Sequence, residues 1–167
     1  MAWKYAAFSA MCPECTLDET AALASSVGID GLEWRVTKKA PEPITEVSHW
    51  GVNRSTVDVN DIEADLKRAK EIADQRGLEM PVLGTYMKCD ELPVVEAVMR
   101  AGASVGCRKL RVGPPMYDGS RPYQELFDQA ARLKPMMLTQ RVVNQRGSEP
   151  ARAAAAPAAE GANQMAA

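Results

Sequence analysis

The stretch Gly28-Ile29-Asp30-Gly31-Leu32-Glu33-Trp34-Arg35-Val36 decides the fold predicted for this chain of 167 residues. It opens on a glycine at the end of a helical pattern and continues as a strand in which apolar and charged side chains alternate. Successive side chains of a strand point to opposite faces of a sheet, so Leu32, Trp34 and Val36 share one face. The two charged residues share the other face. We therefore predict one face covered by helices and an opposite face that carries charge.

Strand-like and helix-like segments alternate on both sides of this stretch. We predict strands at 3–10, 30–36, 79–87 and 109–112, each followed by a helix, at 16–28, 58–77, 91–106 and 122–133. A capping box starts the first helix at Thr16, and Gly77 ends the second. Parallel neighbours need helical crossovers, so this alternation predicts an α/β fold with one parallel sheet in the order 1-2-3-4 and all helices on one face.

The fold class expected from this pattern is an incomplete (β/α)₈ TIM barrel of about four βα units. A complete barrel typically needs about 250 residues and builds its active site from loops after all eight strands. Residues 1–135 form the expected half-barrel, and residues 136–167 form an Ala-rich, low-complexity tail that we expect to be disordered. The abrupt change of composition there suggests a frameshift or an early stop. A flavodoxin-like doubly wound sheet is the alternative, but a helix on its second face would bury Glu33 and Arg35.

Composition excludes several classes of function. The formal net charge of -2 argues against a nucleic-acid partner, which usually requires a clustered basic surface. No signal-peptide pattern is present, and no apolar run approaches the roughly 20 residues of a membrane helix. We therefore expect a cytoplasmic protein without a membrane partner.

Four cysteines are present: Cys12, Cys15, Cys89 and Cys107. The first two form a CxxC directly before the first helix, a spacing also found in redox and zinc sites. A zinc site would need a second close pair, and the other two cysteines are too far apart for one. The favoured interpretation is a pair of reduced thiols in a βα loop.

The charged strand residues are the main candidates for ligand binding. Glu33 and Arg35 point away from the predicted helices, and Arg111 repeats that pattern in the fourth strand. This arrangement predicts a polar pocket for a hydroxyl-rich or anionic small molecule at the C-terminal edge of the sheet. The alternative is a charge cluster that only fills the interior.

Two loops supply further candidates. His49 and Trp50 lie in the long segment 37–57, where a lid could stack the indole on a sugar ring; the alternative is a surface histidine beside a packing tryptophan. Tyr117, in the loop after the fourth strand, could reach the same pocket. The loop carboxylates, Glu14, Asp90 and Asp118, are more typical of caps or solvated residues than of metal ligands.

Several of these segments together resemble the sugar phosphate isomerase/epimerase family, the xylose-isomerase-like barrels. The resemblance covers residues 3–135. It rests on Thr16-Leu17-Asp18-Glu19, on 28–35, on Trp50-Gly51-Val52-Asn53, on Gly84-Thr85-Tyr86, and on 103–112. It implies that Glu33, Arg35, Tyr86, Arg111, His49 and Trp50 line the first half of a substrate site.

The resemblance also implies a reaction. Intact members move a proton between carbons of a sugar or polyol with the help of a divalent ion such as Mn, Mg, Co or Zn. Their metal ligands come from strands five to eight, so it implies no metal cofactor in this chain and leaves the catalytic residues unknown. The superfamily includes abasic-site endonucleases, but the negative net charge of this chain disfavours an activity on nucleic acid. Two hypotheses follow: an inactive isomerase-related domain that takes a small carbohydrate or polyol, or a non-catalytic half-barrel that binds ligand weakly or forms a homodimer through its open sheet edge.

Overall fold

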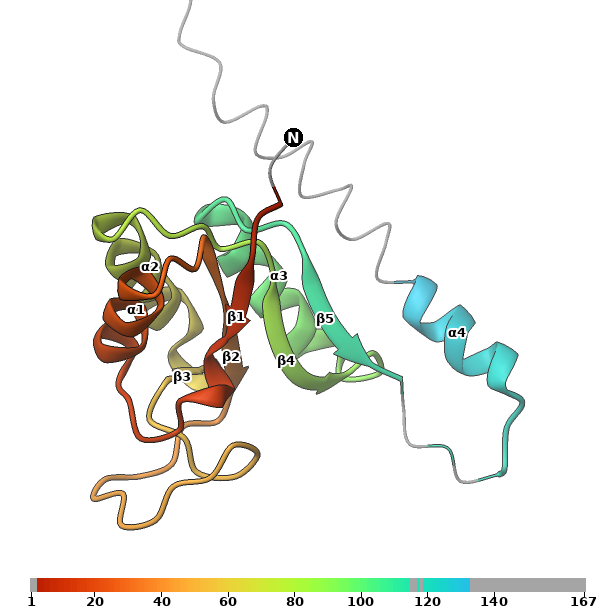
Figure 1. Cartoon of the computed structure of the whole chain (residues 1–167). Helices are drawn as coiled ribbons and strands as arrows, with labels where there is room; N and C mark the ends of the chain where they lie inside the picture. The colour runs from red at the N-terminus through yellow and green to blue at the C-terminus, as the bar shows by residue number, and fades with distance from the viewer. Residues whose placement is uncertain (1–2, 115–116, 118, 133–167) are drawn as a thin grey trace, which may run out of the picture.

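The computed structural model describes residues 3–114, 117 and 119–132, which form an α/β fold on a parallel sheet of five strands. Figure 1 shows β1, β2, β4 and β5 next to one another, with α1 and α2 at the left of the view and α4 at the right. The strands are β1 (Ala6–Phe8), β2 (Gly31–Thr37), β3 (Thr56–Asp58), β4 (Leu83–Lys88) and β5 (Leu110–Gly113); the helices are α1 (Leu17–Ser26), α2 (Ile62–Gln75), α3 (Leu92–Ser104) and α4 (Tyr123–Ala131), with 3₁₀ turns η1 (Ser9–Met11) and η2 (Val59–Asp61).

The sheet follows the order β1-β2-β4-β5. The four predicted strands are therefore present, parallel and in the predicted order. The first is shorter than predicted, because the chain turns into η1 directly after Phe8. The third begins at Leu83, and its predicted N-terminal part supplies only an isolated bridge between Glu79 and Gly31.

The short strand β3 was not predicted from the sequence. It pairs with residues 35–37 of β2, whereas β1 pairs with residues 31–33. Since β4 occupies the other edge of β2, β3 continues the β1 side of the sheet beyond the end of β1. Three residues are too few to show a period-two pattern, so the sequence does not distinguish β3 from the long loop.

Helices α1, α2 and α3 form one layer on one face of the sheet, with α2 in contact with both neighbours (Figure 1). Thr16 closes the predicted capping box of α1 with Glu19, and Gly77 takes a left-handed backbone conformation (φ 68°) after α2. Helix α4 lies beyond β5, apart from this layer. The prediction that all helices cover one face is therefore correct for α1–α3 and wrong for α4, because a helical pattern does not determine where a helix docks.

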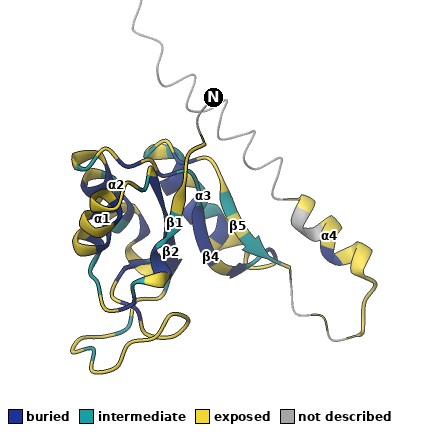
Figure 2. Ribbon diagram, in the orientation of Figure 1, coloured by how far each residue is buried: buried dark blue, intermediate teal, exposed yellow. Residues whose placement is uncertain are grey.

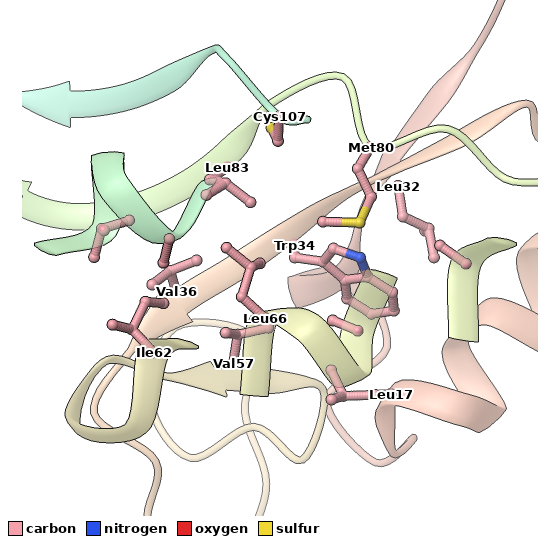
Figure 3. Packing of buried hydrophobic residues seen from close by; sticks show 14 of the residues in the cluster. Leu17, Leu32, Trp34, Val36, Val57, Ile62, Leu66, Met80, Leu83 and Cys107 are labelled. Atoms are coloured by element: carbon pink, nitrogen blue, oxygen red, sulfur yellow. The ribbon is translucent and has the colours of Figure 1, made fainter. Parts of the chain in front are cut away.

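The hydrophobic core lies between the sheet and these three helices (Figure 2). Figure 3 shows side chains of β2, β3, β4, α1 and α2 meeting there. Trp34 is 0 % exposed, and its neighbours Leu32 and Val36 are equally buried. Full burial of one such side chain contributes about 1.5–3 kcal/mol. The alternation predicted for this strand is confirmed, since its apolar residues face the helices.

Three predicted features lie outside the residues that the structure describes. The expected low-complexity tail, 136–167, and the domain boundary at 135 lie outside the described residues, as does Asp118. Among the described helices, none combines the length and the apolar character that a membrane span requires.

Candidate functional site

The open face of the sheet, meaning the face opposite α1–α3, carries an ion pair. Arg111 of β5 places Nη2 2.9 Å from Oε1 of Glu33 in β2. The strand β4 lies between these two strands, and its residue at this level is Gly84, which is in register with Arg111. The pair therefore spans β4 above a residue that has no side chain.

Gly84 is a steric requirement of this arrangement. A Cβ atom added there would overlap Glu33 Oε1 and would lie 2.7 Å from Cε2 of Phe8 and 2.9 Å from Arg111 Nη2. Sequence reasoning did not single out Gly84 or Phe8 as site residues. The available signal was an isolated glycine inside a strand, which commonly marks the close approach of another group.

Phe8 and Arg111 also contact each other. The guanidinium carbon of Arg111 lies 4.8 Å from the centroid of the Phe8 ring, a cation–π distance. Glu33 Oε1 is shielded from solvent, and its contact with Arg111 lacks hydrogen-bond alignment. This oxygen has a charge partner but no aligned donor among the described residues.

Arg35 holds the loop that follows β2 rather than facing solvent. Its guanidinium donates to Oγ1 of Thr56 and to the carbonyl oxygens of Trp50 (3.2 Å) and Gly51 (2.8 Å). It also lies 5.0 Å from the centroid of the Tyr86 ring. Arg35 is buried, and its partners come from the loop, from β3 and from β4. Its geometry is that of a positioning residue for the loop.

The result of this tether is an aromatic corner formed by Trp50 and Tyr86. Their ring centroids are 6.4 Å apart, and the rings are nearly perpendicular at 81°. Trp50 is 70 % exposed and Tyr86 is 38 % exposed, so both rings present surface to solvent. Tyr86 follows Gly84 by two residues and shares its face, which brings the corner next to the ion pair.

Two predicted site residues are not part of this group. His49 is exposed on the same loop and makes no side-chain hydrogen bond or ion pair within the described residues. Tyr117 stacks on Tyr123 of α4, with ring centroids 4.2 Å apart and planes at 15°. The structure thus pairs Tyr117 with α4 and not with the open face.

A buried polar network anchors the base of the loop. Asn53 donates to the Ala10 carbonyl (3.1 Å), and its own Oδ1 accepts from the backbone nitrogen of Ser55 (2.9 Å). Ser55 and Ser9 exchange hydroxyl-to-carbonyl hydrogen bonds. The Asn-x-Ser spacing typical of an Asx turn was the sequence signal for this network. The network joins the end of β1 to the segment before β3. It therefore holds the end of the loop that carries Trp50.

The CxxC segment is a turn in which both thiols are free and partly exposed. Burial raises the pKa of Cys12 and of Cys15, and the nearby Glu14 carboxylate raises both further. Thiols of this kind are mostly protonated at neutral pH. This environment does not match a thioredoxin-like site, where the thiol pKa is lowered.

The described residues contain no group of three or more His, Cys, Asp or Glu side chains arranged to hold a metal ion. Of the predicted site residues, Glu33 is engaged with Arg111, and His49 stands alone on its loop. The donor set of a catalytic divalent ion is therefore not assembled in this part of the chain.

Comparison with known proteins identified no family model that matches this chain and no curated protein that is similar to it.

Proposed function

We propose that this chain is the first half of a (β/α)₈ barrel of the sugar isomerase/epimerase kind, and that it binds a small carbohydrate or polyol on its open face without turning it over. The single observation that carries this proposal is the aromatic corner of Trp50 and Tyr86 beside the Glu33–Arg111 pair. A sugar combines apolar C–H faces, which pack on aromatic rings, with hydroxyls, which need carboxylate and guanidinium partners.

The topology supports the half-barrel interpretation. All three helices that pack on the described sheet cover the same face. In a complete (β/α)₈ barrel the helices likewise cover only the outer face of the strands. A doubly wound fold needs helices on both faces. The charged residues on the open face favour the half-barrel over the doubly wound fold, because Glu33 and Arg111 would be costly to bury under a helix.

The state of the arginines favours a neutral ligand over a phosphorylated one. Arg35 is engaged by the loop carbonyls and by Thr56, and Arg111 is paired with Glu33. An anionic ligand would have to displace the Glu33 carboxylate or compete with it. A polyol needs only to add hydrogen bonds to the pair.

Titration of ¹⁵N-labelled protein with xylitol, D-xylose and glucose 6-phosphate tests the binding site. Three tryptophan indole signals serve as reporters: Trp50 at the corner, Trp34 in the core and Trp3, which is 87 % exposed elsewhere. We expect xylitol and xylose to shift the Trp50 signal and to leave the other two unchanged, and Glu33→Gln to weaken the effect. Equal shifts of Trp3 and Trp50, or none, would contradict the proposal.

The absence of turnover is tested by a metal-supplemented assay. We expect no isomerase or epimerase activity on ketoses or polyols with added Mn²⁺, Mg²⁺ or Co²⁺, because the described residues do not assemble a donor set for such an ion. Activity that disappears in Glu33→Ala would overturn this expectation and would show that two copies build a working site.

Self-association is part of the proposal, because β1 and β5 each have one strand neighbour in the described sheet. Open edges present unpaired backbone groups to a second copy. The Lys109 carbonyl accepts from β4, and so does that of Arg111. The backbone N–H and C=O groups of the alternate residues, Leu110 and Val112, therefore point toward the free edge.

We expect a concentration-dependent homodimer in size-exclusion chromatography with light scattering. Val112→Pro removes a free-edge N–H that pairing needs, so it should shift the protein to monomer. The variant should still fold, since proline is tolerated on edge strands. Val112→Thr keeps that N–H and is the matched control. A monomer at all concentrations would rule out pairing at this edge.

A further inference from the structure

The Cys12–Cys15 turn is a second chemical feature of the molecule, and it is independent of the proposed carbohydrate site. The backbone nitrogen of Cys15 donates to the Cys12 carbonyl oxygen at 3.1 Å, which closes a four-residue turn. Such a turn holds the first and fourth Cα atoms within about 7 Å of each other. Disulfides span Cα separations of about 4.4–6.8 Å, so the turn already brings the two cysteines near bonding distance.

The turn is fixed on both sides. The Cys12 nitrogen donates to the Ser9 carbonyl, and the Pro13 carbonyl accepts from the Arg54 nitrogen at 2.9 Å. Directly after Cys15, Thr16 begins the capping box of α1. A covalent bond between the two cysteines would therefore lie within a segment that is already held in place.

The remaining thiols do not compete for oxidant. Cys89 and Cys107 are buried in the hydrophobic core, whereas Cys12 and Cys15 are both partly exposed. Cys12 also contributes electrostatically to the raised pKa of Cys15, as expected for two thiols within one turn. The chain thus holds one accessible pair of adjacent thiols.

We propose that Cys12 and Cys15 form a vicinal dithiol that a two-electron oxidant of the hydroperoxide class converts to an intramolecular disulfide without change of fold. One thiolate attacks a peroxide oxygen, the O–O bond breaks, and a sulfenic acid forms with release of water or alcohol. The second thiolate attacks the sulfenic sulfur, the S–S bond forms and the S–O bond breaks. The leaving hydroxide takes up a proton to become water.

The raised thiol pKa sets the speed of this reaction. Only the thiolate is nucleophilic, and its fraction rises about tenfold per pH unit below the pKa. The disulfide should therefore form slowly at neutral pH and faster as the pH rises.

The experiment uses the whole chain, reduced and then treated with hydrogen peroxide across a range of pH. In the Cys89→Ser/Cys107→Ser variant we expect intact mass spectrometry to show loss of two hydrogens, and peptide mapping to join Cys12 to Cys15. Cys12→Ser and Cys15→Ser added to this background should instead gain oxygen or form intermolecular dimers. Circular dichroism should be the same before and after oxidation.

Three results would overturn the proposal. They are stable oxygen addition while both cysteines are present, a disulfide that joins one of them to Cys89 or Cys107 in the unmodified chain, and a rate that is independent of pH.

Discussion

On the face of β2 that the helices cover, Trp34 and its apolar neighbours are excluded from solvent; on the opposite face of the same strand, the Glu33 side chain is 23 % exposed and its partner Arg111 is 52 % exposed. The covered face is held by the area that it buries, which is non-directional and large. The open face is held by a few directional contacts around Gly84 and Arg35. Substitutions on the covered face should therefore cost the most stability, and those on the open face should cost less.

Trp34→Ala should have the largest effect and would test the covered face. Removing a fully buried aromatic side chain leaves a cavity and costs about 3–5 kcal/mol. Urea denaturation followed by circular dichroism would measure the loss in the free energy of unfolding. Trp3→Ala is the matched control, since Trp3 is 87 % exposed and its removal should cost less than about 0.5 kcal/mol. Equal costs for the two variants would remove the distinction between core and surface.

Arg35→Met should come next and would show whether the open face has its own structural contact. The guanidinium binds Thr56 and two loop carbonyls, and hydrogen bonds to a charged group contribute about 1.5–3 kcal/mol. We expect a loss of about 2 kcal/mol, together with faster proteolysis between β2 and β3. Arg35→Lys should recover only part, because an ammonium cannot reproduce the planar fork. Unchanged proteolysis would show that the loop is held without Arg35.

Gly84→Ala should have a smaller effect and would test how closely the open face is packed. The added methyl would overlap Glu33 and crowd Phe8, and overpacking of this kind costs about 1–3 kcal/mol. Gly113→Ala is the control, because the nearest atom to its added Cβ lies 3.5 Å away. Chemical denaturation of both variants would compare them. Equal stability would show that the Glu33 and Phe8 side chains can move aside freely.

The covered face could be predicted from the sequence, and most of the open face could not. The alternation of Leu32, Glu33, Trp34 and Arg35 determines which residues face the helices, because the side-chain period of a strand is two. Four parallel strands in the observed order follow from the same reasoning. Strand β3 could not be predicted in this way, because a strand of three residues shows no measurable side-chain period.

The site could be predicted only as a set of residue types. Alternation placed Glu33, Arg35 and Arg111 on one face, but it could not show that Arg35 is engaged by the loop while Arg111 pairs with Glu33. Those partners depend on side-chain rotamers and on the path of the chain between β2 and β3, which no local pattern encodes. The position of Tyr117 in the loop after β5 predicts a place in the site, but its ring stacks on Tyr123 of α4 instead.

The smallest effect should belong to the Glu33–Arg111 pair, which a double-mutant cycle of Glu33→Gln and Arg111→Gln would measure. Both side chains reach solvent, and exposed ion pairs contribute about 0.2–1 kcal/mol. We expect a coupling energy below about 1 kcal/mol at low ionic strength. It should fall further in 1 M salt, where the screening length shrinks to about 3 Å.

A coupling energy several times larger that does not change with salt would contradict the difference between the two faces. It would mean that Glu33 and Arg111 are screened from water as a core pair is, because only shielded charges keep their attraction in concentrated salt. A dependence of that coupling on protein concentration would show that a second copy of the chain covers the open face. A weak, salt-sensitive coupling leaves the pair accessible, which a hydroxyl-bearing ligand requires.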